Sequence, residues 1–383
     1  MYVLTIGRSY PSKATGMMGI FELEQARALS NNGCEVTYVF CDTRSIKSLR
    51  KYGNFRGKTD DVNIYGQHLP IGGLTQNIFE KIKSRYLKKV INKAISNHGF
   101  PDVIHVHFPL LTLTEEIWKF LRSFNRPIVV TEHWTKVQTK SLEPFRISFL
   151  NKVVDEANEF ICVGEPLKKS VFELTHTEKH IRVIPNMVSP LFYFQQATGN
   201  NEKSNQFEFI TVGRLVEVKR FNVVVEAFSK AFSNNKNVHL TIVGGGPLYD
   251  KLNQQVQNLD MKDQISLLGF LSREETAKKV RKSDAFVSAS VLETFGVPFI
   301  EAMASGKPVI GAVGGAIDTY IDESNGLLFQ ADNVDDLSKS LKFMVDNRMN
   351  YNERQIAEKA DHLFSENAVA KNLIDTFNQL IKK

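Results

Sequence analysis

The sequence contains little that would cross-link a small fold or place a chain inside a membrane. Its 383 residues include only three cysteines, Cys34, Cys41 and Cys162, and these form neither a zinc-ligand spacing nor a C-x-x-C pair. No run approaches the roughly 18 apolar residues of a membrane span, and the short apolar stretch at 1–10 is broken by Arg8. We therefore expect a cytoplasmic protein rather than a disulfide-rich secreted domain or an integral membrane protein.

Low-complexity and fibrous compositions are also absent. The chain is 42% hydrophobic and 23% charged, with 23 Gly and 12 Pro, as in ordinary globular proteins. At about 150 residues per domain its length predicts two or three domains, each with enough core to fold without disulfides or metals.

The net charge of +6 is unevenly distributed. Residues 1–200 contain 26 Lys and Arg against 18 Asp and Glu, which leaves 22 against 24 for residues 201–383. The densest basic segment runs from Lys81 to Lys93, beside a partial helical stripe of apolar residues. Its basic residues are Lys81, Lys83, Arg85, Lys88, Lys89 and Lys93. Two interpretations of this segment stay open. It is either a helix bound peripherally to the inner face of an anionic membrane, or a helix whose charged face is simply solvated.

Nucleic acid is not an expected partner, because no zinc-finger spacing, basic zipper or RNA-binding aromatic motif accompanies the charge.

Apolar runs of strand length alternate with amphipathic stretches of helix length in both halves of the chain. This alternation is typical of parallel sheets with crossover helices. The expected strands are 2–7, 35–41, 103–107, 127–131, 159–163 and 181–185, then 207–213, 239–243, 264–268, 285–288 and 308–311. We predict an α/β fold of two facing Rossmann-like domains with a central cleft.

The domain boundary is expected near the polar stretch 195–206, which is rich in Asn, Gln and Ser and reads as a linker. The predicted domains are 1–190 and 191–365. The tail 366–383 should form a further helix, with the N-terminal domain as one candidate packing partner. Open parallel sheets bind ligands beyond the carboxyl ends of their strands, and this rule selects the candidate residues below.

A dense motif follows the expected strand 285–288 and runs from Leu292 to Gly311. Glu293 leaves the carboxyl end of that strand, and Pro298 and Gly306 are placed to begin and end a short helix. Glu301 falls in the first turns of this helix, where its carboxylate could accept two hydrogen bonds from a vicinal diol such as a ribose. The free amides at the helix start, those of Phe295, Gly296 and Val297, would suit a phosphate.

Cations and a histidine follow other strands. Arg214 and Lys219 come after the expected strand 207–213, where two fixed cations would neutralise a diphosphate. His133 follows the expected strand 127–131 and is expected at the edge of the cleft. His105 and His107 are assigned to opposite faces of their strand, with at least one in the core.

Several chemistries find no support in the sequence. There is no Asp-x-Asp motif after an apolar strand, no His/Cys cluster with metal spacing and no G-x-S-x-G elbow. The run Gly244-Gly-Gly-Pro247 matches no full phosphate-loop pattern, and a sharp turn alone explains it. No metal ion and no cofactor are expected.

The two glutamates, with seven residues between them, and their flanks Glu-Thr-Phe-Gly and Glu-Ala-Met-Ala-Ser-Gly-Lys-Pro-Val-Ile resemble the signature of retaining glycosyltransferase family 4, of GT-B fold. The resemblance implies metal-independent transfer of a hexosyl group from a nucleotide sugar, with a UDP-sugar as the default donor. It implies that Arg214 and Lys219 hold the diphosphate as it departs, that Glu293 binds the sugar and that Glu301 binds the ribose. It further implies that His133 contacts the donor sugar and that Gly19 matches the family's glycine loop near the diphosphate.

The acceptor is expected to be a glycan or a lipid-linked glycan in cell-surface polysaccharide synthesis. Two alternatives remain from the sequence: a sugar-nucleotide epimerase of the same fold, and a transferase-like subunit that binds without turnover.

Overall fold

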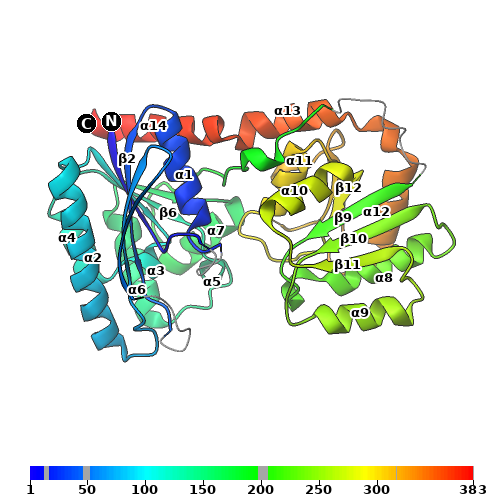
Figure 1. The fold of residues 1–383 in the computed structure, drawn as a ribbon, viewed down its shortest axis with the longest axis horizontal. Coiled ribbons are helices and arrows are strands. Elements are labelled where there is room, and N and C mark those ends of the chain that lie inside the picture. The colour runs from blue at the N-terminus through cyan, green and yellow to red at the C-terminus, as the bar shows by residue number, and fades with distance from the viewer. Residues whose placement is uncertain (13–16, 46–51, 197–205, 316, 383) are drawn as a thin grey trace. The chain divides into compact units, whose positions relative to one another are not determined.

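The computed structural model describes residues 1–12, 17–45, 52–196, 206–315 and 317–382 (Figure 1). The chain divides into two compact units. Unit 1 comprises Met1–Met187 and Glu366–Lys383, and unit 2 comprises Val188–Ser365. The expected linker 195–206 lies largely outside the described residues. Unit 1 is therefore built from two separate segments of the chain.

Unit 1 contains a sheet of eight strands in the order β3-β4-β2-β1-β5-β6-β7-β8. Its strands are β1 (Tyr2–Gly7), β2 (Glu35–Asp42), β3 (Gly53–Thr59), β4 (Val62–His68), β5 (Val103–His107), β6 (Ile128–Glu132), β7 (Glu159–Cys162) and β8 (Arg182–Val183). Its helices are α1 (Ile20–Asn31), α2 (Gln76–His98), α3 (Pro109–Thr112), α4 (Glu115–Arg122), α5 (Thr135–Gln138), α6 (Pro144–Glu156), α7 (Glu165–Thr175) and α14 (Glu366–Ile381). All neighbouring strands are parallel except the hairpin of β3 and β4.

The central strands of unit 1 are the ones that the apolar runs predict. Every residue of β1, β5 and β6 is buried, as expected for parallel strands covered by helices on both faces. The hairpin of β3 and β4 was not predicted. β3 is an edge strand with the polar sequence Gly-Asn-Phe-Arg-Gly-Lys-Thr, so pairing with β4 rather than an apolar pattern makes it a strand.

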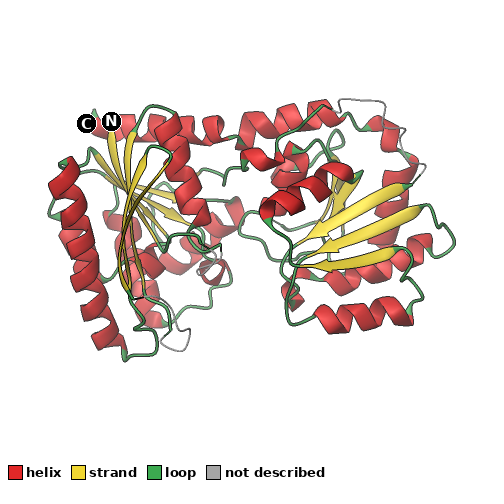
Figure 2. Ribbon diagram, in the orientation of Figure 1, coloured by secondary structure: helices red, strands yellow, loops and turns green. Residues whose placement is uncertain are grey.

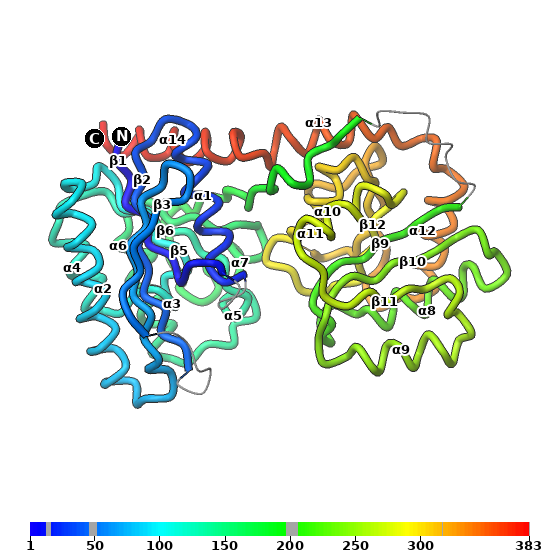
Figure 3. Tube along the Cα trace, in the orientation of Figure 1, coloured from blue at the N-terminus to red at the C-terminus, as the bar shows by residue number. Residues whose placement is uncertain are grey.

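α14 packs beside α1 on the sheet of unit 1 (Figure 3). It contributes four side chains to the hydrophobic core of that unit, Val369, Ala370, Leu373 and Phe377. The core of unit 1 thus includes residues from both ends of the chain.

Unit 2 contains a parallel sheet of six strands in the order β11-β10-β9-β12-β13-β14, with helices on both faces (Figure 2). The strands are β9 (Phe207–Val212), β10 (Val238–Val243), β11 (Ile265–Gly269), β12 (Ala285–Val287), β13 (Val309–Ala312) and β14 (Gly326–Phe329). The helices are α8 (Phe221–Phe232), α9 (Tyr249–Asn258), α10 (Arg273–Lys282), α11 (Val297–Ala304), α12 (Val334–Asp346) and α13 (Glu353–Phe364), with 3-10 turns at Pro190–Phe192, Glu217–Lys219, Asp318–Tyr320 and Arg348–Asn350. The sequence predicted these strands except β14.

α2 separates the basic residues of the segment 81–93 into different environments. Lys81, Arg85, Lys89 and Lys93 are exposed and follow one another at four-residue intervals, so they form one stripe along the helix. Lys83 is only 3% exposed, which corrects the expectation that it belongs to the solvent-facing charge. Lys88 pairs with Glu116 at 2.7 Å. Among the described residues, no helix is both long enough and apolar enough to cross a bilayer.

Candidate active site

The carboxyl edge of the sheet in unit 2 brings together most of the residues that the sequence selected. The loop after β9 bears Arg214 and Lys219, and the loop after β12 bears Glu293. α11 begins directly beyond that second loop and includes Glu301. β9 and β12 are neighbours in the sheet, so their loops emerge side by side.

Lys219 and Glu293 form an ion pair between these two loops. The Lys219 Nζ contacts the Glu293 Oε1, and the two side chains are 23% and 13% exposed. The amide of Val291 donates to the carbonyl of Val218 at 3.4 Å, which joins the loops beside the pair. An ammonium and a carboxylate are thereby fixed at the carboxyl edge of the sheet.

The N-terminus of α11 presents backbone amides at the same edge. Gly296 precedes the helix with φ of 91°, a left-handed conformation that glycine adopts without strain. Among the described residues, no acceptor receives the amides of Phe295, Gly296 or Val297. The free amides and the helix dipole make this position suitable for an anion.

The side chain of Phe295 is a core residue rather than a ligand-binding group. It is 1% exposed and packs edge-on against the rings of Tyr320 and Phe364, with centroids 6.0 Å and 5.7 Å away. Phe295 can therefore contribute to binding through its backbone amide, while its ring holds the loop in place.

Glu301 is paired with a residue that the sequence analysis missed. Arg273 Nη2 lies 3.1 Å from Glu301 Oε1, and both side chains are less than one fifth exposed. Arg273 is the first residue of α10 and follows the carboxyl end of β11. The rule that selects residues beyond strand ends would have identified it.

Arg214 is exposed, and no described carboxylate lies within 4.0 Å of its guanidinium. Its turn packs against the loop after β10. A Cβ on Gly244 would lie 1.8 Å from the carbonyl oxygen of Gly213, and φ of Gly244 is 146°. The glycine run at 244–246 thus allows a close approach of two loops, in agreement with the interpretation that it is a turn.

His133 lies in unit 1, at the carboxyl end of β6, and is 6% exposed. Its Nε2 is 3.1 Å from the Nδ1 of His107, and its ring stacks on Phe108 with centroids 4.5 Å apart. The Arg8 guanidinium lies 3.4 Å from the centre of the Phe108 ring. It also forms an ion pair with Glu22 at 2.7 Å. Arg8 directly follows β1, so the strand-end rule would also have selected it.

The assignment of His105 and His107 to opposite faces is wrong. Residues two apart in a strand share a face, and the two rings lie 4.2 Å apart, both fully buried. Burial lowers the pKa of His105 to about 3. Burial also holds the pKa values of His107 and His133 well below the usual range, and the nearby charge of Arg8 lowers these two values further. All three imidazoles are neutral at neutral pH.

Glu132 supports His133 from the preceding position. Its Oε1 accepts the amides of His133 and Trp134, each at 2.8 Å. Burial raises the pKa of Glu132 to about 7, although these two hydrogen bonds oppose the shift. The chain is therefore held in a fixed turn just beyond β6.

Gly19 precedes α1 with φ of 90°. A Cβ at this position would lie 2.0 Å from the carbonyl oxygen of Ser9, so a larger residue would displace the loop after β1.

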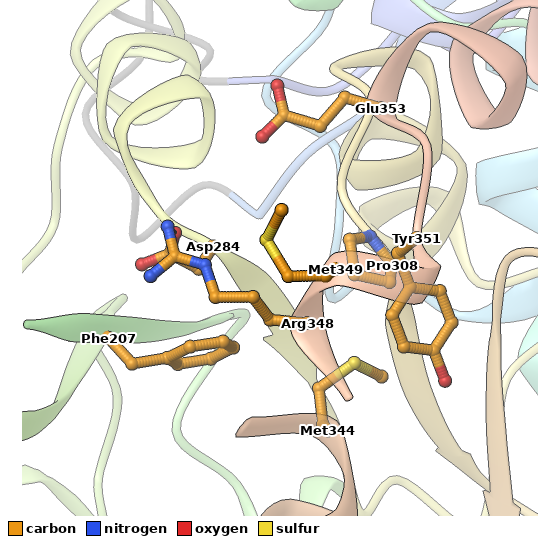
Figure 4. A pocket seen from close by; sticks show the side chains of 8 residues that line it. All are labelled: Phe207, Asp284, Pro308, Met344, Arg348, Met349, Tyr351 and Glu353. Carbon is orange, nitrogen blue, oxygen red and sulfur yellow. The ribbon is translucent and has the colours of Figure 1, made fainter. Parts of the chain in front are cut away.

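A small cavity of about 90 Å³ lies at the opposite edge of the sheet in unit 2 (Figure 4). Phe207, Asp284 and Pro308 line it from the amino ends of β9, β12 and β13, and Arg348 binds Asp284 there at 2.9 Å. It lies away from the strand ends where the candidate residues gather, and we assign it no part in the active site.

Two family models match the chain. The model described as Glycosyltransferase Family 4 matches residues 19–190, and the model described as Glycosyl transferases group 1 matches residues 194–362. The alpha-monoglucosyldiacylglycerol synthase of Streptococcus pneumoniae is 30% identical over 87% of this chain and 80% of its own length. The chain is a family 4 glycosyltransferase. The N-acetyl-alpha-D-glucosaminyl L-malate synthase of Bacillus anthracis is 26% identical over 58% of the chain and 60% of that enzyme.

Solved structures show that this glycosyltransferase has the GT-B fold. Sucrose-phosphate synthase from Thermosynechococcus elongatus superposes with a TM-score of 0.77 at 18% identity, covering 100% of this chain and 99% of that one. HepE from Anabaena, solved with UDP and glucose, gives a TM-score of 0.70 at 16% identity, covering 99% and 100%. The predicted α/β class and its Rossmann-like domains are confirmed.

The structure of the glycosyltransferase groups the predicted residues by unit. Arg214, Lys219, Glu293, Glu301 and the amides of 295–297 share one sheet edge in unit 2, while His133 and Gly19 belong to unit 1. Among the described side chains, no three of His, Cys, Asp and Glu gather as metal ligands.

Proposed function

We propose that this glycosyltransferase retains the configuration of the sugar and transfers it from a UDP-sugar to a lipid-linked or glycan acceptor without a metal ion. The observation on which the proposal rests is the edge of the sheet in unit 2. Two cations, free helix amides and two oriented carboxylates meet there, and they complement a nucleoside diphosphate attached to a polyol.

The diphosphate would bind Arg214, Lys219 and the amides of Phe295, Gly296 and Val297. When the bond from the anomeric carbon to the diphosphate oxygen breaks, negative charge grows on that oxygen. Fixed cations and amides stabilise this charge without reorganising, which accelerates departure. The acceptor hydroxyl would attack from the side of the leaving group and pass its proton to the departing diphosphate oxygen, so no protein nucleophile is needed.

The carboxylates and the histidine would bind the rest of the donor. Glu293 would accept hydrogen bonds from sugar hydroxyls and favour positive charge at the anomeric carbon. Its partner Lys219 has three ammonium protons, so it can bind Glu293 and a phosphate together. Glu301 would hold the ribose, and His133 and Gly19 would contact the donor.

Named relatives support the choice of substrates. HepE was solved with UDP and with UDP-glucose, and the S. pneumoniae relative is named for a glucosylated diacylglycerol. We propose a role in assembling cell-surface polysaccharide or its lipid-linked intermediates, with the protein held peripherally on the inner face of the membrane by the exposed stripe of α2.

The decisive experiment incubates the protein with a panel of nucleotide sugars, with and without membrane extract. Nucleotide release that requires the extract supports transfer, and NMR of the product should show the anomeric configuration of the donor. Isomerised sugar nucleotide without transfer would support the epimerase instead, and an inverted product would refute retention.

The same assay tests the two cations. Arg214→Ala and Lys219→Ala should each lower kcat by about 10²-fold or more with a smaller change in donor affinity, because their interaction strengthens as charge develops. Arg354→Ala, an exposed arginine on α13, is the matched control. Activity should persist in chelator, and its loss there with recovery on adding Mg²⁺ or Mn²⁺ would refute metal independence.

A further inference from the structure

A cavity of about 470 Å³ opens at the carboxyl edge of the sheet in unit 1. Its walls come from segments that follow four strands: Thr43 after β2, the start of α2 after β4, Leu110 to Glu115 after β5, and the start of α6 after β6. This is the edge at which open parallel sheets bind ligands. All of its lining residues belong to unit 1.

The wall contains a buried ammonium that lacks a carboxylate partner. Lys83 is 3% exposed and donates to the carbonyl oxygen of Leu111 at 2.5 Å. No described carboxylate lies within 4.0 Å of its Nζ. The Phe79 ring is 5.9 Å away, and the titratable groups that act on the ammonium are Cys41, Arg146 and Glu80. An ammonium has three donors, and burying one with a single neutral acceptor is costly. An anion in the cavity would remove this cost.

Arg146 adds a second cation to the same wall. It donates to the carbonyl oxygen of Leu110 at 3.1 Å and pairs with the exposed Glu143 at 2.9 Å. The other acidic residues of the wall are engaged elsewhere: Glu115 binds Lys152 at 3.2 Å, and Glu80 accepts from Gln76. The two cations are thus the charged groups of this wall that can bind an anionic ligand.

The remainder of the cavity is apolar and continues to the surface. Phe79, Phe145 and Phe149 line it together with Leu110 and Leu111. Phe145 is 50% exposed, and Ile78 and Leu74 at the same end of α2 are 50% and 45% exposed. The exposed basic stripe of α2 begins one turn further along the helix, at Lys81.

We propose that this cavity binds the acceptor, an amphiphile with a phosphate group beside a hydrocarbon chain. The phosphate binds the Lys83 ammonium and the Arg146 guanidinium, and the start of the chain lies against Phe79, Phe145 and Phe149. The exposed Leu74 and Ile78 and the basic stripe place the mouth of the cavity against an anionic lipid surface, from which the chain enters. This inference rests on the proposed function and specifies its acceptor.

Calorimetric titration with three water-soluble probes separates the two parts of the ligand. Dioctanoyl phosphatidic acid has phosphate and chains, dioctanoylglycerol has chains alone, and glycerol 3-phosphate has phosphate alone. We expect the first to bind at least tenfold more tightly than either of the others. Equal binding of dioctanoylglycerol would overturn the phosphate site, and equal binding of glycerol 3-phosphate would overturn the chain site.

Two variants with matched controls locate the ligand. Lys83→Met keeps the length and the apolar stem of the side chain. It should weaken the binding of phosphatidic acid at least tenfold and leave the affinity for dioctanoylglycerol unchanged. Lys88→Met on the same helix, outside the cavity, is its control. Phe145→Ser should weaken the binding of both lipids at least fivefold. Phe100 is 56% exposed, and Phe100→Ser should weaken the binding of neither lipid.

Wild-type affinity in both Lys83→Met and Phe145→Ser would overturn the inference, as would failure of the wild type to bind phosphatidic acid. Phe145 is exposed, so its variant should fold even if the Lys83 variant does not. UDP release from UDP-sugar in the presence of membrane extract is measured alongside. If UDP is released while phosphatidic acid does not bind, only this inference fails. If the wild type releases no UDP from UDP-sugar even with the extract, the proposed function fails.

Discussion

Each glutamate of the motif is held by a cation from a different loop. Lys219 contacts Glu293 and Arg273 contacts Glu301, in pairs whose side chains are between 11% and 23% exposed. Partly buried pairs are less screened by solvent than surface pairs, so they fix the carboxylates in place more effectively. Both carboxylates are therefore oriented before a donor arrives.

Replacing Glu301 tests the ribose assignment. Glu301→Ala should weaken UDP binding by about 1.5 to 3 kcal/mol, because two hydroxyls lose a charged acceptor. Calorimetric titration with UDP measures this, with Glu358→Ala on the exposed face of α13 as the control. Unchanged UDP affinity in a folded Glu301→Ala protein would refute the assignment.

Glu132 makes the stability of unit 1 depend on pH. Its pKa is raised from 4.5 to about 7 by burial, so the folded state binds the proton more tightly than the unfolded state. The stabilisation from the protonated carboxyl is complete below pH 4.5 and is lost as the pH rises through 7. At ~1.36 kcal/mol per pKa unit, the loss is roughly 3 kcal/mol.

Glu132→Gln should remove this dependence while its side-chain oxygen still accepts the two amides. We expect wild-type stability, relative to the variant, to fall between pH 5 and pH 8 in urea denaturation. Glu178→Gln, an exposed residue of the same unit, changes the net charge equally and serves as the control. An equal difference between wild type and Glu132→Gln at both pH values would contradict the prediction.

At the scale of elements, α2 has three kinds of lysine. One is buried in a cavity wall, one is paired across to α4, and the others belong to the exposed stripe of Lys81, Arg85, Lys89 and Lys93. Attraction to an anionic surface depends on exposed charge within a Debye length, so only the stripe can act in this way.

If the stripe binds membranes, the protein should co-sediment with vesicles containing anionic lipid at low salt and be released as salt rises. Each basic residue near the surface contributes about 1 kcal/mol, so replacing the four stripe residues with Gln should abolish most binding. A control with equal charge change replaces Lys262, Lys278, Lys339 and Lys342, which are exposed in unit 2. Equal sedimentation of the two variants, or none by the wild type, would leave α2 as a solvated helix.

At the scale of the whole molecule, the hydrophobic core of unit 1 includes side chains of the last helix of the chain. α14 follows all of unit 2 in the chain, yet its side chains complete the N-terminal core. Phe377 is fully buried and lies edge-on to the ring of His105, with centroids 5.4 Å apart.

Phe377→Ala should lower the free energy of unfolding of unit 1 by about 3 to 5 kcal/mol, because a large buried ring leaves a cavity. Phe343→Ala, at 50% exposure on α12, should cost much less. Urea denaturation followed by circular dichroism compares the two. Similar losses for both would show that α14 is not part of the cooperative core of unit 1.

The pattern of apolar runs was sufficient for the fold class and for the central strands, because buried parallel strands must be apolar along their length. The position of residues just beyond the strands was sufficient to select Arg214, Lys219 and Glu293, and the helix expected after Pro298 was sufficient to select Glu301. These features are local, so they can be read from neighbouring residues in the chain.

Only the tertiary structure decided which partners meet. The pairs of Lys219 with Glu293 and of Arg273 with Glu301 span 74 and 28 positions, and α14 joins α1 from the other end of the chain. Lys83 and Lys81 look alike in the sequence, yet only one is buried. Burial and pairing depend on elements that approach from distant parts of the chain, and a local pattern does not contain that information.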